Sequence, residues 1–143
     1  MLVEASDELE AIDGEDRLSI PVMEVRMHLH IAAQQWDIAA ACAGRVVDAK
    51  PDDEQGWISW AYAARRLVGI PTAEAILLRA EKLLGEKCAL IHFNLACYRC
   101  QLGDISGARE RLRIACKMEP AMKAMALDDP DLEPMWTAIT DTK

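Results

Sequence analysis

The chain has 143 residues, enough for one domain that buries roughly two thirds of its unfolded surface. Apolar residues make up 52% of it, with one Phe and six Pro, which is typical of a helical globular protein rather than of a disordered chain. The formal net charge is −8 and no stripe of Lys and Arg alternates with aromatic residues, which argues against nucleic acid or an anionic membrane as a partner.

The first 19 residues are predicted to form an acidic N-terminal arm. Residues 1–17 contain seven acidic residues and one basic residue, and therefore carry −6 of the total charge. A segment of this kind is usually solvated, so we expect the arm to be partly mobile. It lacks the basic start and apolar run of a signal peptide, and no stretch approaches the roughly 18 apolar residues of a membrane span. These features predict a cytoplasmic protein.

Three segments after the arm share one spacing of small and apolar residues. The first residues of the three sets, Ala39, Ala73 and Ala108, are 34 and then 35 residues apart. The helix breakers Pro51, Gly85 and Pro120 repeat at the same steps. Such a period indicates stacked hairpins, each too small to bury its apolar face alone. The pattern predicts helical hairpins over about 20–52, 53–87 and 88–121. The repeated sets are Ala39, Ala43 and Val46; Ala73, Leu77 and Ala80; Ala108, Leu112 and Ala115.

The first helix of the second and third hairpins repeats as well. Trp57, Trp60 and Ala61 correspond to His92, Leu95 and Ala96 at a step of 35. The whole pattern resembles the tetratricopeptide repeat, in the small stand-alone form known from bacteria. Trp60 replaces the usual Leu, Gly85 replaces the closing Pro, and Arg26 stands where the first copy would have Leu. The resemblance implies an all-α fold, an α-solenoid of about three helix-turn-helix repeats over residues 20–127.

Residues 128–143 are predicted to contain a capping helix and a tail. Leu132, Met135, Trp136 and Ile139 recur at i, i+3, i+4 and i+7, the spacing of one apolar helix face. We expect a helix over 131–140 that packs against residues 108–116 and covers the last hairpin. The alternative is a short motif that binds another protein.

The sequence "NLACYRCQLGD" contains a Cys-x-x-Cys pair, Cys97 and Cys100, five residues after His92. On a helix, each residue is rotated by about 100° about the helix axis relative to the one before it. Relative to Cys88, the side chains therefore point at about 40° for His92, 120° for Cys100 and 180° for Cys97. Ligands spread in this way cannot surround one tetrahedral ion. Redox pairs of this type begin a helix, whereas Cys97 is predicted to lie inside one. We therefore interpret the five cysteines as packing thiols and predict no metal or cofactor. A metal or redox sensor remains an alternative. The cysteines are Cys42, Cys88, Cys97, Cys100 and Cys116.

The sequence has no Gly-rich phosphate loop, no His-Glu-x-x-His and no serine elbow, so we do not expect an enzyme. The resemblance implies a concave groove, lined by the first helix of each hairpin, that holds a protein segment. Some family members clamp a carboxylate with Lys, Arg and Asn, but Ile58 and Phe93 occupy lysine-like places here, which argues against that clamp. The positions assigned to the groove are Glu24, His28, Ile31, Ile58, Tyr62, Arg65, Arg66, Phe93, Asn94, Cys97, Cys100 and Gln101.

Within this groove, Tyr62 and Phe93 are the expected anchors, and Arg65 with Arg66 forms a charged corner. The alternative is that Tyr62 packs between repeats and the arginines are ordinary surface charges. We expect Arg65→Glu to weaken partner capture, and Arg111→Glu on the convex helix to have little effect. The acidic arm is a further candidate to contact Arg65 and Arg66 and to compete with the partner.

The sequence thus predicts a non-enzymatic scaffold or adaptor that binds a partner protein segment. A chaperone for a secreted or assembling subunit is an alternative, because bacterial secretion chaperones also resemble three such repeats.

Overall fold

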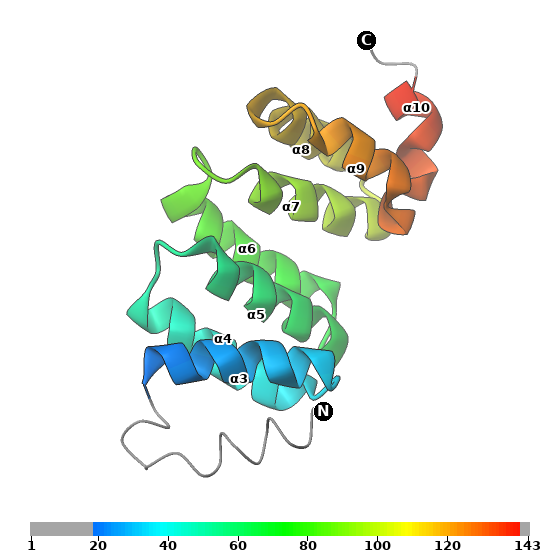
Figure 1. The fold of residues 1–143 in the computed structure, drawn as a ribbon. Coiled ribbons are helices and arrows are strands. Elements are labelled where there is room, and N and C mark those ends of the chain that lie inside the picture. The colour runs from blue at the N-terminus through cyan, green and yellow to red at the C-terminus, as the bar shows by residue number, and fades with distance from the viewer. Residues whose placement is uncertain (1–18, 141–143) are drawn as a thin grey trace. The chain divides into compact units, whose positions relative to one another are not determined.

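The computed structural model describes residues 19–140, and within this range every regular element is helical (Figure 1). The predicted all-α class is confirmed. Residues 1–18 of the acidic arm lie outside the described residues. The chain divides into two compact units, unit 1 (Met1–Ile76) and unit 2 (Leu77–Lys143), with the boundary inside helix α6. None of the helices over 19–140 combines the length and the apolar character that crossing a bilayer requires.

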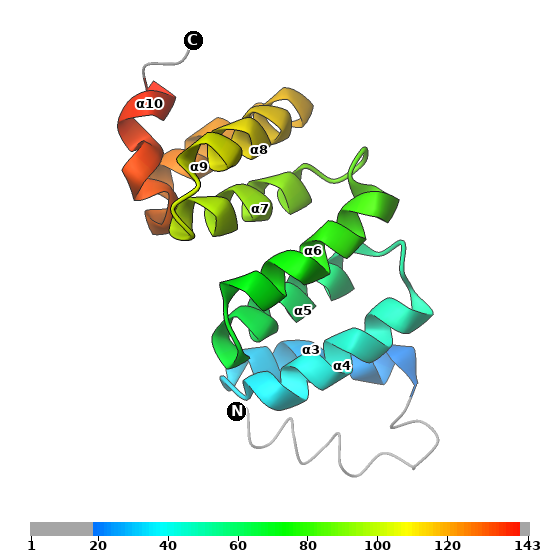
Figure 2. The ribbon, with the colours of Figure 1, turned by 180° about the vertical axis from the view of Figure 1, so that it is seen from behind.

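Unit 1 contains α3 (Ile20–Ala32), α4 (Trp36–Ala49), α5 (Glu54–Leu67) and the first part of α6 (Ile70–Leu84) (Figure 2). Helix α4 packs against both α3 and α5, and α3 also contacts α5. The approach of α5 to α4 depends on Gly56, because a Cβ there would lie 3.1 Å from side-chain carbons of both Val46 and Val47. The core of α3 and α4 is made of Met23, Met27, Cys42, Ala43 and Val46.

Unit 2 continues with α7 (Ala89–Gln101), α8 (Ile105–Met118), α9 (Met122–Asp128), the 3-10 helix η1 (Pro130–Met135) and α10 (Trp136–Thr140). Helices α7 and α8 form a sequence-adjacent pair. The turn between them uses Gly103 at φ +87°, and Asp104 caps α8 by accepting a 2.9 Å hydrogen bond from the Gly107 N–H. Ala108 and Ala115 are fully buried, which lets the two helices approach closely.

The C-terminal segment differs from the single helix predicted over 131–140. It forms η1 and then the short α10, and Pro134 lies inside η1. Proline has no N–H for the α-helical hydrogen bond and its ring clashes with the preceding turn, which favours the break. Three residues of the predicted apolar stripe are nevertheless buried, since Leu132, Met135 and Ile139 are at most 7% exposed, and Trp136 is half-buried. The helices on which this segment packs also differ from the prediction, which named residues 108–116 of α8. Instead, η1 packs on α7, and α10 packs on α9 and η1.

An ion-pair network in unit 2 joins α6, α7 and α8. Arg111 donates to both carboxylate oxygens of Glu81, with an Nη2 to Oε1 distance of 3.1 Å, and its Nη1 lies 3.2 Å from His92 Nδ1. His92 Nε2 lies 2.7 Å from the carbonyl oxygen of Gly85, so the neutral tautomer with its proton on Nε2 satisfies both contacts. The hydrogen bond from Arg111 holds the pKa of Glu81 below its usual value. The expectation that Arg111→Glu has little effect is therefore wrong. The substitution would remove the ion pair and place a second carboxylate beside that of Glu81.

Candidate binding surfaces

Unit 1 presents a cluster of Trp36, Tyr62 and Arg66, here called the aromatic–arginine cluster. Tyr62 and Arg66 lie one turn apart on α5, and Trp36 begins α4. The Arg66 guanidinium carbon lies 4.3 Å from the centre of the Tyr62 ring and 5.3 Å from that of Trp36. The two rings meet edge to face with centres 5.8 Å apart. Tyr62 is 42% exposed, so the cluster is accessible to a partner.

The turn before α4 holds Trp36 in this position. Gln34 adopts φ +59°, and the N–H groups of Gln34 and Gln35 donate to the carbonyl oxygens of Ile31 and His30. The His30 ring also bonds the Gln35 side chain, with 2.6 Å between Nδ1 and Oε1. These contacts fix the backbone immediately before Trp36.

Two exposed apolar residues directly follow the cluster in the chain. Leu67 ends α5 with 50% of its surface exposed, and Val68 caps the helix with 70% exposed. Single exposed apolar residues are common, but these two directly follow Arg66 in the chain. The end of α5 therefore combines apolar, aromatic and cationic surface, the composition that dominates interface energetics.

The groove residues predicted in unit 1 have different environments. Glu24 forms an ion pair with Lys50, whose Nζ lies 3.0 Å from Oε1. The rings of Tyr62 and Trp36 both contact Arg66. His28 is exposed, whereas Ile31, Ile58 and Arg65 are half-buried.

The groove residues predicted in unit 2 are largely covered. Phe93 and Cys97 are each 3% exposed and Cys100 is 5% exposed, all within the core of unit 2. Asn94 is half-buried, and the exposed Gln101 donates a 2.9 Å hydrogen bond to the carbonyl oxygen of Asp131 in η1. Phe93 is thus a core residue and cannot serve as the exposed anchor that we expected. Sequence-based alignment assigned this face of α7 to a partner, but η1 packs on α7.

Cys97, Asp129 and Asp131 bring one thiol and two carboxyl groups together at this contact, with one ligand atom of each within 4.8 Å of the others. The Cys97 thiol donates to Asp129 Oδ2 at 3.5 Å, while Asp129 Oδ1 accepts from the Asp131 N–H and caps η1. Within the described residues this group offers three ligand atoms, whereas a structural zinc site has four. The group therefore attaches η1 to α7. Cys100, the other member of the predicted pair, is not part of it.

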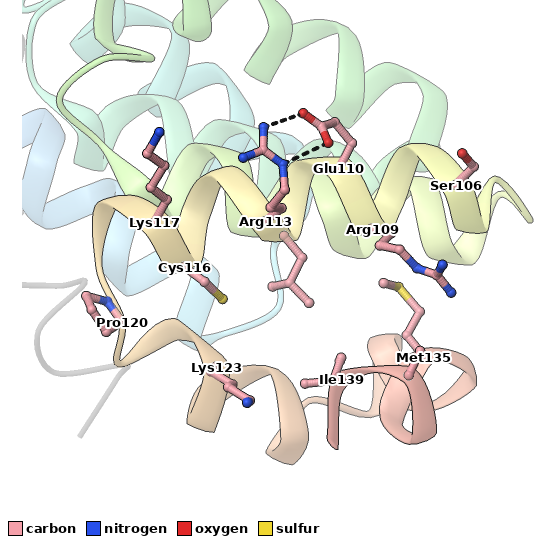
Figure 3. A pocket seen from close by; sticks show the side chains of 12 residues that line it. Ser106, Arg109, Glu110, Arg113, Cys116, Lys117, Pro120, Lys123, Met135 and Ile139 are labelled. Atoms are coloured by element: carbon pink, nitrogen blue, oxygen red, sulfur yellow. Dashed lines mark hydrogen bonds and ion pairs between the residues drawn. The ribbon is translucent and has the colours of Figure 1, made fainter. Parts of the chain in front are cut away.

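Unit 2 also contains a cavity of about 660 Å³ between α8 and the C-terminal segment, here called the α8 slot (Figure 3). Leu112, Met135 and Ile139 are buried and form its floor. Figure 3 shows Arg109, Met135, Cys116, Ile139 and Lys123 around the gap, whereas Arg113, Glu110 and Lys117 point away from it. The lining also includes Ser106, Pro120 and Ala138.

The cations around the slot differ in their pairing. Arg113 forms a two-point pair with Glu110 at 2.7 and 3.0 Å. Arg109 has no hydrogen bond or ion pair to any residue within 19–140. Sequence analysis missed this site, although Arg109, Arg113 and Lys117 recur at i, i+4 and i+8. That spacing predicts a basic face but not a cavity, because the slot also needs α10 opposite α8.

The thiols differ in accessibility. Cys42, Cys88, Cys97 and Cys100 are buried, whereas Cys116, on the wall of the slot, is half-buried. Burial raises the pKa of the Cys116 thiol, and the nearby Lys123 partly opposes this effect. Cys116 is thus the cysteine that a reagent in solution reaches most readily.

Comparison with protein-family models finds no match to this chain, and a search of curated proteins finds none either.

Proposed function

We propose that this protein is a tetratricopeptide-like scaffold, an α-solenoid of three helical hairpins, that binds a segment of a partner protein and catalyses no reaction. The repeated 34- and 35-residue spacing and the sequence-adjacent helix pairs support the repeat assignment. The observation that carries the binding proposal is the Arg66 guanidinium stacked on the exposed ring of Tyr62. The binding site is therefore the aromatic–arginine cluster of unit 1.

The cluster suits a partner segment in which an apolar residue lies beside an acidic one. The apolar side chain packs on the exposed part of the Tyr62 ring. The N–H groups of Arg66 then donate to the carboxylate, a charge-assisted contact that a fixed planar guanidinium makes well. Stacking restricts Arg66 before the partner arrives, so less side-chain entropy is lost on binding.

The experiment is affinity capture from native lysate, with single variants of the cluster compared with matched controls. Arg66→Glu and Tyr62→Ala should each weaken capture of the same partner by at least about tenfold, or 1.4 kcal/mol. Lys82→Glu and Leu83→Ala are the controls, because both side chains are exposed on α6 and lie outside the cluster. Both controls should capture the partner within about twofold of wild type.

A photo-crosslinking residue at position 62 tests direct contact. It should attach covalently to the captured partner, whereas the same residue at position 83 should not. Circular dichroism checks that each variant keeps its helix content. If the folded Arg66→Glu and Tyr62→Ala variants capture the partner as well as wild type does, the cluster is not the binding site.

A further inference from the structure

The α8 slot is a second site whose chemistry differs from that of the aromatic–arginine cluster. We propose that it binds a small carboxylate with an unbranched apolar chain. The inference does not depend on the proposed protein-binding function, because every residue of the slot lies in unit 2 and none belongs to the cluster.

The slot exists because the helix that follows α8 is short. Helix α8 has 14 residues, whereas α9 has only seven and so can pair with about half of that length. The chain then turns through η1 into the five-residue α10, which supplies Ala138 and Ile139 as the opposite wall. A cavity with an apolar floor therefore remains between elements that are themselves packed into the core of unit 2.

Size favours a slender ligand over a partner helix. A volume of about 660 Å³ lies within the usual range of small-molecule pockets, roughly 300–1,000 Å³. A three-turn helix about 10 Å across and 16 Å long occupies on the order of 1,300 Å³, so only one side of it could enter. An extended apolar chain can instead lie wholly between α8 and α10.

Charge favours a carboxylate, with Arg109 as its partner. Arg109 and Lys123 are the cationic side chains that lie around the gap, and Glu110, the acidic residue of the lining, points away from it, although the chain as a whole carries −8. Arg113 is already engaged by Glu110, whereas the Arg109 guanidinium lies beside Met135 at one end of the slot and has no hydrogen bond or ion pair within residues 19–140 (Figure 3). A guanidinium next to an apolar floor can bind a carboxylate through two parallel hydrogen bonds.

The same geometry gives the direction of the bound chain. From Arg109, the apolar tail runs along α8 past Leu112 to Cys116, a distance of about 10 Å along the helix axis. Met135 and Ile139 cover it from the other side. Cys116 therefore lies beside the tail, and a bound ligand shields its thiol from reagents in solution.

The test follows alkylation of Cys116 in the full-length reduced protein. Iodoacetamide labelling is measured by mass spectrometry against increasing decanoate, decanol or decylamine. Decanoate should slow the labelling of Cys116 at least about fivefold at saturation, decanol should act only at higher concentration, and decylamine should have little effect. The buried Cys42 and Cys88 report on unfolding by the amphiphile and should stay unlabelled throughout.

Three variants test the assignment of the residues. Arg109→Gln should weaken decanoate protection about tenfold, and Ala138→Phe, which fills the slot, should abolish it. Lys117→Gln is the matched control, because it removes one positive charge from the same helix at a side chain that points away from the slot. It should change the half-protecting concentration less than twofold.

The proposal is overturned if decanoate gives no protection, if all three amphiphiles protect equally, or if Arg109→Gln and Lys117→Gln behave alike. A further outcome would also overturn the proposal. If decanoate does not protect Cys116 in the wild-type protein and Ala138→Phe loses partner capture, the slot binds a protein and not a small carboxylate.

Discussion

Replacement of Arg111 by methionine tests how the ion-pair network stabilises unit 2. The variant keeps a long apolar stem but removes both hydrogen bonds to Glu81 and the contact with His92 Nδ1. Breaking a buried ion pair costs about 3–5 kcal/mol, and breaking an exposed one costs about 0–1 kcal/mol. The Arg111 and Glu81 side chains are 23% and 30% exposed, between these limits. We therefore expect a loss of about 2 kcal/mol, measured by urea denaturation at pH 7.

The matched control is Arg113→Met on the same helix. Its two-point pair with Glu110 has similar geometry, but both side chains are 59% exposed, so its removal should change stability much less. The effect of Arg111→Met should also depend on pH. Arg111 lowers the pKa of Glu81, so the stabilisation is present above the ordinary value of 4.5 and is lost as pH falls through the folded-state pKa. Equal losses in the two variants at pH 7, or a difference unchanged at acidic pH, would refute this reasoning.

Three further predictions concern unit 2. Leu132→Ala should destabilise it by about 2–5 kcal/mol, because Leu132 is fully buried; a loss below about 1 kcal/mol in urea denaturation would show that η1 contributes little to packing. Gly85→Ala should lower the melting temperature, because a Cβ there would lie 2.6 Å from the carbonyl oxygen of Glu81, and an unchanged melting temperature would contradict this. The purified reduced protein should contain no stoichiometric zinc by elemental analysis, because Cys97, Asp129 and Asp131 offer three ligand atoms and a structural zinc site has four; one bound equivalent, lost in Cys97→Ala, would overturn that interpretation.

The helices were predictable because small residues recur where helices approach. Ala39, Ala43, Ala73 and Ala80 were chosen from spacing alone, and all four have no exposed surface. The C-terminal stripe was predictable in the same way, since periodicity identifies which side chains are buried. Periodicity does not identify the element on which they pack, and it could not show that η1 would cover Cys97. The 3-10 geometry depends on Pro134 in that particular setting.

The candidate sites were less predictable because each joins residues that are distant in the sequence. The i, i+4 spacing of Tyr62 and Arg66 is visible in the sequence, but the contact of Trp36 with the same guanidinium is not, because Trp36 reaches it from another helix. Arg111 resembled an ordinary surface charge because Glu81 lies 30 residues away. The α8 slot required the position of α10, which no local pattern specifies.

The attachment of η1 to α7 also sets a limit on the affinity of any ligand for that face of α7. Such a ligand binds only molecules in which η1 has detached, so its apparent dissociation constant is the intrinsic one divided by the detached fraction. If η1 is detached in about one molecule in a hundred, the apparent affinity falls about hundredfold. Variants that loosen the contact, such as Gln101→Ala, would then strengthen binding while weakening the fold.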